Sequence, residues 1–215
     1  MKSGAFNKMI AESYTTPQKT LSVYGRFLKE AGLLTMGEKG WKAPDMTPLD
    51  AARMTIALLA SDGPRHCVER VKLFGAARFT PSFRRKVRGY ETMSADQFRA
   101  RIEGETLEDA LAYLLSEPSR VGLEQSAASF AHGAPFELRV SVFDVLAELS
   151  WPNREGDETT GELVAPFKGS ASLGELSDAG IKGGIRTVRS ISGLQFFGVG
   201  IALAADGPGA SREVS

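Results

Sequence analysis

The chain is poor in the residues that build disulfides and zinc sites. Its 215 residues include one cysteine, Cys67, and two histidines. A single cysteine excludes an internal disulfide, so we expect a cytoplasmic location, where thiols stay reduced. One cysteine and two histidines are also too few for the usual four-ligand Cys/His zinc site. We therefore expect neither a metal nor a cofactor.

Long apolar runs are missing as well. No stretch approaches the ~20 consecutive apolar residues that a helix needs to cross a bilayer. The first residues, MKSGAFNKMIAESYTTPQ, contain no continuous apolar core of the signal-peptide kind. The sequence therefore predicts no membrane association.

Signatures of catalysis are equally scarce. His66 and Cys67 are adjacent, and adjacent residues on a helix point about 100° apart, so they do not form a nucleophile–base pair. The glycines of SGLQFFGVGIALA lack the spacing and the Lys-Ser/Thr of phosphate-binding loops, so they indicate close packing or sheet curvature. Five acidic residues lie close together in the sequence, and they are better explained as first-turn acids at helix N-termini than as ligands of a divalent metal. They are Asp96, Glu103, Glu105, Glu108 and Asp109. We expect no enzyme.

Net charge is zero, but the charges are segregated along the chain. Residues 1–90 contain 16 Lys and Arg against 7 Asp and Glu, and residues 91–215 contain 10 against 19. Such asymmetry is typical of a protein with one half that faces nucleic acid. The alternative is that the two halves simply attract each other.

The first part of the chain predicts helices. A short helix is expected over residues 4–12. A second is expected from Pro17 to Ala31, with Thr16 as its N-cap and Gly32 as its stop. Its buried stripe is expected to be Leu21, Tyr24, Leu28 and Ala31, widened by Phe27. Further helices are expected over residues 48–60, 62–78, 94–104 and 106–118.

The remaining pattern predicts strands. Leu33 and Leu34, a Gly-rich turn and WKAP indicate a short hairpin. Apolar residues alternate over 136–142 and 145–151, followed by the polar connector PNREGDETTGE and a short strand, LVAPF. Residues 185–204 are interpreted as a second hairpin, and the last residues as disordered. The fold class expected is α+β, with an N-terminal helical region and a C-terminal antiparallel sheet.

The order of the expected elements resembles the winged helix-turn-helix fold of DNA-binding proteins. This order is a helix, a short turn, a second helix, the segment EAGLL and a Gly/Lys-rich hairpin. The resemblance covers about the first 60 residues. It implies that residues 17–31 form a recognition helix, with one face buried and the other in the major groove.

The resemblance and the basic charge together define the candidate DNA contacts. Gln, Arg, Lys, Ser and Thr pair readily with base edges. On the recognition helix and wing the candidates are Thr16, Gln18, Lys19, Thr20, Ser22, Arg26, Lys39 and Lys42. A second basic segment, FRRKVRGY, adds Arg84, Arg85, Lys86 and Arg88 as phosphate contacts. The alternatives are a solvated helix face and an exposed basic loop that balances the acidic half.

The resulting hypothesis is a DNA-binding transcriptional regulator, with a phage-like setting expected. It divides the chain into a basic DNA-binding region (1–90), an acidic helical connector (91–134), a sheet for oligomerisation or partner binding (135–205) and a disordered tail (206–215). The partners expected are double-stranded DNA, a second or further copy of the chain through the 185–204 hairpin, and a protein that binds the acidic half. A small-terminase-like packaging protein, a protein-interaction adaptor and a small-molecule sensor remain alternatives.

Overall fold

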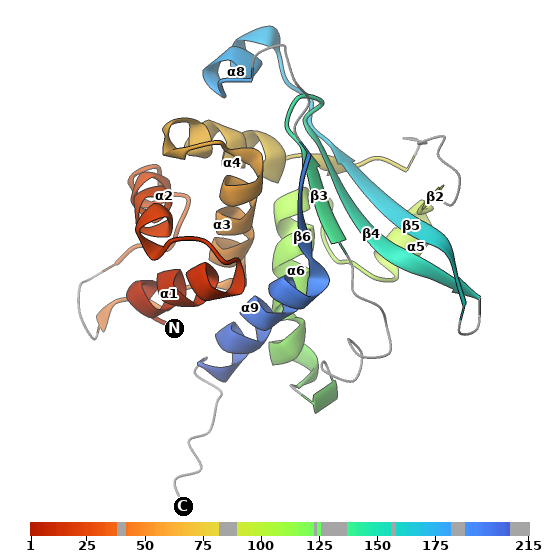
Figure 1. Cartoon of the computed structure of the whole chain (residues 1–215), viewed down its shortest axis with the longest axis horizontal. Coiled ribbons are helices and arrows are strands. Elements are labelled where there is room, and N and C mark those ends of the chain that lie inside the picture. The colour runs from red at the N-terminus through yellow and green to blue at the C-terminus, as the bar shows by residue number, and fades with distance from the viewer. Residues whose placement is uncertain are drawn as a thin grey trace, which may run out of the picture.

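The structure is a computed structural model that describes residues 1–37, 42–81, 90–122, 124–125, 137–155, 158–181 and 188–206. Figure 1 shows α1 to α4 and α9 gathered on one side of a twisted sheet. The helices are α1 (Ser3–Ser13), α2 (Gln18–Glu30), α3 (Pro48–Ala60), the 3-10 turn η2 (Pro64–His66), α4 (Cys67–Gly75), α5 (Ala95–Arg99), α6 (Leu107–Val121), α8 (Leu173–Asp178) and α9 (Gly193–Ala205). The strands are β1 (Arg78–Phe79), β2 (Tyr90–Thr92), β3 (Glu137–Ser141), β4 (Leu146–Glu155), β5 (Glu158–Lys168) and β6 (Val188–Ser192). The α+β class, helical first and antiparallel later, is confirmed.

The central helix α3 has the predicted bounds because its first turn is strongly capped. The Thr47 hydroxyl accepts from the backbone N–H of Asp50, and the Asp50 carboxylate accepts from the N–H of Thr47. Pro48 occupies the first helical position, where no N–H partner is lost. The helix is buried on most sides, as its composition predicts.

Gly32 terminates α2 as predicted, although the last helical residue is Glu30 and not Ala31, and the predicted start is wrong. Gly32 adopts φ 70°, and Leu33 N–H donates to the carbonyl of Leu28, which closes the helix. At the other end the N-cap is Pro17, and the Thr16 hydroxyl donates to the carbonyl of Tyr14. Thr16 does not cap α2 because its own N–H still donates to α1, at Ala11.

The turn between α1 and α2 contains a strained residue. Thr15 adopts φ 51°, a left-handed conformation that a β-branched residue rarely takes. We expect Thr15→Gly to raise the free energy of unfolding by roughly 0.5–1 kcal/mol, because glycine removes a strain of about 1–2 kcal/mol but loses more chain entropy. Urea unfolding measures the change. Gly32→Ala is the matched control and should lower stability, and a less stable Thr15→Gly variant would contradict the assignment.

The predicted wing strands are not observed in the part of that segment that is described. Residues 31–37 and 42–47 contain no strand. The segment is instead fastened to α3, because Thr35 donates to the Asp50 carboxylate through both its N–H and its hydroxyl. The predicted helix over residues 62–78 is also shorter: α4 ends at Gly75, and Arg78 begins β1.

The sheet has the order β1-β5-β4-β3-β6, and β2 pairs with β5 in parallel. The two alternating segments do form β3 and β4. The expected polar connector and short strand are wrong, because β4 continues to Glu155 and β5 already begins at Glu158. A bulge between Asn153 and Arg154 lets the two strands stay paired.

The predicted C-terminal hairpin is wrong. β6 ends at Ser192, whose hydroxyl accepts from the N–H of Gln195 in a capping box, and residues 193–205 form the helix α9. α9 packs on α6: a Cβ at Gly200 would lie 2.9 Å from the Leu115 carbonyl oxygen. A strand edge at residues 194–204 therefore cannot be the interface between copies. Oligomerisation itself stays a prediction.

One hydrophobic core runs through the described chain. It joins residues such as Phe6, Ile56, Leu111, Leu149 and Phe196, which come from the basic region, the connector and the sheet region. The sequence-based boundaries at residues 90 and 134 stay a prediction, but the helices and the sheet share this core. α2 lies at its outer border, on the side away from the sheet (Figure 1).

Candidate nucleic-acid interface

The outward face of α2 carries the predicted contact residues. Gln18, Lys19, Ser22 and Arg26 are exposed, and Thr16 and Thr20 are half-buried. The opposite side buries Leu21, Tyr24, Gly25 and Leu28. Ala31 does not belong to the buried stripe as predicted: it is exposed, because α2 has already ended at Glu30.

Gly25 also belongs to the buried stripe of α2, although the sequence analysis did not assign it there. A Cβ there would lie 3.5 Å from the Met54 methyl carbon and 3.6 Å from the Asn7 amide. These are ordinary van der Waals distances, so α1 and α3 pack directly against α2 at this position. The result is a firmly seated helix with one polar, basic face.

The basic side chains on this face have weak partners or none among the described residues. Arg26 Nε lies 3.8 Å from Glu30 Oε1, and both side chains are about two-thirds exposed (66% and 65%). Exposed pairs of this kind contribute ~0–1 kcal/mol, so Arg26 can exchange Glu30 for another acceptor. Lys19 has no hydrogen bond or ion pair within the described part of the chain. The Ser22 hydroxyl donates to the Gln18 carbonyl.

The other predicted contacts are less informative. Lys42 is exposed. Five lie outside the described residues, namely Lys39, Arg84, Arg85, Lys86 and Arg88. Among the described residues, the structural support for a nucleic-acid interface therefore comes from α2.

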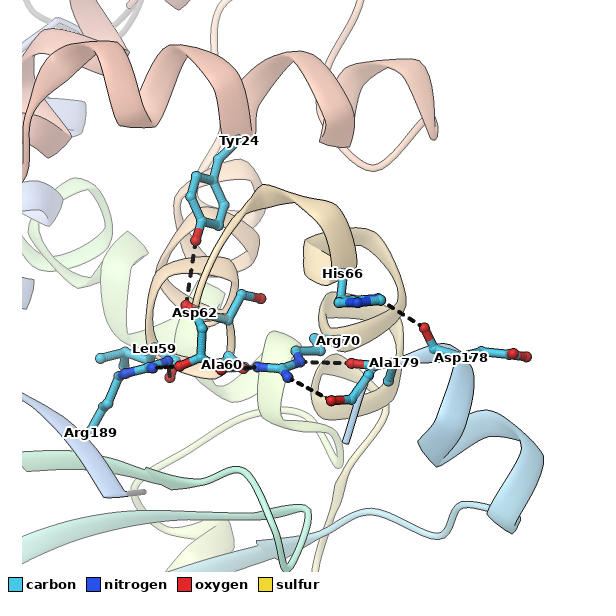
Figure 2. A network of polar contacts seen from close by, with 11 residues as sticks. Tyr24, Leu59, Ala60, Asp62, His66, Arg70, Asp178, Ala179 and Arg189 are labelled. Atoms are coloured by element: carbon cyan, nitrogen blue, oxygen red, sulfur yellow. Dashed lines mark hydrogen bonds and ion pairs between the residues drawn. The ribbon is translucent and has the colours of Figure 1, made fainter. Parts of the chain in front are cut away.

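A buried arginine, which the sequence analysis missed, organises the region behind α2 (Figure 2). Arg70 of α4 is only 4% exposed. Its Nε donates to the Ala179 carbonyl at 2.8 Å and its Nη2 to the Gly180 carbonyl at 3.3 Å. Its Nη1 donates to the Ala60 carbonyl and reaches Asp62 Oδ2 at 3.4 Å. One guanidinium thus joins the end of α3 to the segment after α8.

Asp62 extends this network to the sheet and to α2. Its carboxylate also accepts from Arg189 of β6, and next to it Tyr24 of α2 donates to the Ser61 carbonyl at 3.4 Å (Figure 2). Burial alone would raise the pKa of Asp62, but Arg189 and Arg70 together hold it below its ordinary 3.8. The stabilisation from ionised Asp62 is therefore present above pH 3.8 and is lost as the pH falls below that value.

The cysteine and histidine next to this network do not form a nucleophile–base pair. Cys67 is fully buried, whereas His66 Nδ1 lies 3.2 Å from the Asp178 carbonyl oxygen, to which it donates in the Nδ1–H tautomer. Burial, together with the charge of Glu69, raises the pKa of the Cys67 thiol to about 11.

The thiol of Cys67 should therefore be inert in the folded protein. At about pH 8 only ~1 thiol in 1,000 with such a pKa is ionised, and the thiolate is the reactive form. We expect slow reaction with Ellman's reagent, with a full equivalent released once guanidinium unfolds the chain. Rapid stoichiometric labelling of the folded protein would show that Cys67 is accessible.

The acidic residues considered for a metal site are dispersed among structural roles. Glu105 pairs with Arg78, and Glu108 pairs with Arg53 through both oxygens. The Thr106 hydroxyl donates to Asp109 in the first turn of α6. Within the described ranges, no three His, Cys, Asp or Glu residues are grouped as metal ligands would be.

The described helices are also all too short or too polar to cross a membrane. Comparison of the chain with protein-family models, curated proteins and solved structures finds no match.

Proposed function

We propose that this protein binds double-stranded DNA and that the outward face of α2 contacts the base edges. The observation that carries the proposal is the division of α2 into a buried apolar side and a side that exposes Gln18, Lys19, Ser22 and Arg26. Gln pairs with adenine, Arg and Lys pair with guanine, and Ser adapts to either.

Two further observations support the proposal. α2 follows α1 after a four-residue turn, as in helix-turn-helix proteins, and its first residues, Gln18 and Lys19, are those that such proteins direct at bases. Residues 1–90 carry the excess of basic side chains that binding to phosphate requires. We propose that this DNA binding serves transcriptional regulation, in which a rigidly packed recognition helix binds one DNA sequence in preference to others.

The test removes the two charges of this face. We expect the double variant Lys19→Gln, Arg26→Gln to bind duplex DNA about 30-fold or more weakly, because each base contact contributes ~1–3 kcal/mol. Its melting temperature should stay near that of the wild type, because both side chains are exposed. Fluorescence anisotropy over a series of salt concentrations measures both the affinity and the number of phosphates neutralised.

The matched control removes two exposed charges elsewhere. The control is the double variant Arg99→Gln, Arg101→Gln. Arg99 is the last residue of α5 and Arg101 follows shortly after it, on the other side of the molecule from α2. We expect it to bind as the wild type does. Equal loss in both double variants would indicate that only total charge matters, and unchanged binding by the α2 variant would exclude this face.

A further inference from the structure

A cavity of about 410 Å³ lies between α4 and α8, away from the outward face of α2. Small-ligand pockets typically measure ~300–1,000 Å³. Leu73 of α4 and Ala76, directly after that helix, give it an apolar wall. α8 stands away from the main body of the molecule above α4 in Figure 1, so it can form the opposite wall.

Charges of both signs line this cavity, and α4 contributes one of each, Glu69 and Lys72. α8 contributes the carboxylates of Glu175 and Asp178, whereas the end of β5 contributes Lys168 and α4 contributes Lys72. Among the described lining residues, basic and acidic side chains are equal in number, three of each. A ligand with a single charge would leave the lining side chains of its own sign without a counter-charge.

Three of these charged side chains, Glu69, Lys72 and Asp178, have no hydrogen-bond or ion-pair partner among the described residues. Glu175, in contrast, accepts from the N–H and hydroxyl of Ser172. Lys72 is therefore available to a ligand's anionic end, and Asp178, together with Glu69, is available to its cationic end.

The wall formed by α8 is held in place before any ligand binds. Arg70 donates to the carbonyls of Ala179 and Gly180, directly after α8, and His66 donates to the carbonyl of Asp178 itself (Figure 2). Gly180 adopts φ 65°, and a Cβ there would lie 2.6 Å from the His66 ring. Only glycine allows this close approach, which fixes the position of Asp178 relative to α4.

We propose that the cavity between α4 and α8 binds a small zwitterion of the free amino acid class. Its carboxylate is directed at Lys72 and Lys168, its ammonium at Asp178, and its side chain at Leu73 and Ala76. The proposal does not depend on DNA binding, because it uses no residue of α2.

The experiment is a thermal-shift screen of the full chain with the twenty free amino acids. A ligand at roughly 100 times its Kd raises the melting temperature of a chain of this size by roughly 5–10 °C. For each amino acid that stabilises the chain, the decarboxylated amine and the N-acetylated form are the matched probes. We expect neither to give the shift, because each lacks one charge.

Variants locate the site. Lys72→Gln and Asp178→Asn should each raise the Kd of the stabilising amino acid about tenfold or more, and both residues are exposed, so the fold should persist. Lys8→Gln and Asp96→Asn remove the same charges on α1 and α5 and should leave the Kd unchanged. The proposal is overturned if no amino acid shifts the melting temperature, if a singly charged probe binds equally well, or if the control variants lose as much affinity.

Discussion

Replacing Arg70 with alanine is expected to lower the free energy of unfolding by roughly 3–5 kcal/mol, because hydrogen bonds to a charged group contribute ~1.5–3 kcal/mol each and their losses are not additive. Arg70 is 4% exposed, and its guanidinium donates to three backbone carbonyls, at Ala60, Ala179 and Gly180. In the variant these carbonyls lose a charged donor, and Asp62 keeps only Arg189. Urea unfolding measures the loss.

The control for this prediction is Arg65→Ala. Arg65 lies five residues earlier, in η2, and is exposed, so its removal should change stability by less than about 0.5 kcal/mol. Arg70→Lys should fall between the two, because an ammonium cannot reach three carbonyls with the geometry of a guanidinium. An Arg70→Ala variant as stable as the wild type would contradict the assigned network.

Asp50→Ala is expected to be the second most damaging change, with a loss of roughly 3 kcal/mol. The Asp50 side chain is buried and accepts from the N–H groups of Thr35 and Thr47, each at 2.7 Å, and from both hydroxyls, each at 2.8 Å. Hydrogen bonds to a charged group contribute ~1.5–3 kcal/mol, and their losses are not additive. Chemical denaturation of the purified variant gives the value.

Asp96→Ala is the control for Asp50→Ala. It measures how much stability is lost when an acidic residue in the first turn of a helix is removed without such a hydrogen-bond network. Asp96 occupies the first turn of α5, and its side chain is almost fully exposed. Its removal should cost no more than about 0.5–1 kcal/mol. If Asp50→Ala costs no more than that, the bonds to Thr35 and Thr47 contribute little, and the attachment of residues 31–37 to α3 has another cause.

Local signals explain what the sequence predicted well. Thr47, Pro48 and Asp50 fix the start of α3 within four residues, and Gly32 ends α2 because only local backbone geometry is involved. The exposed side of α2 follows from helical spacing alone. Each of these features depends on residues that are neighbours in the chain.

The errors arise where the local signal was weak or misread. Ser192 and Gln195 form a capping box that marks the start of α9, but its apolar sequence resembles a buried strand as closely as a buried helix. The polar residues at the end of β4 and the start of β5 were interpreted as a connector, because strands of an antiparallel sheet can be polar on a face that water reaches. Arg70 could not be recognised, because its carbonyl partners at Ala179 and Gly180 lie more than 100 residues away in the chain.

We propose that the outward face of α2 contacts DNA, and a single photoreactive label on that face tests this contact. Cys67 is buried and is expected to be inert, so Ser22→Cys introduces one labelling site in the middle of that face. A short photoactivatable group on this cysteine should cross-link to duplex DNA in ultraviolet light. The same group on Ser177→Cys, exposed on α8, should not. Cross-linking from Ser177 alone, or from neither position while DNA is bound, would contradict the account.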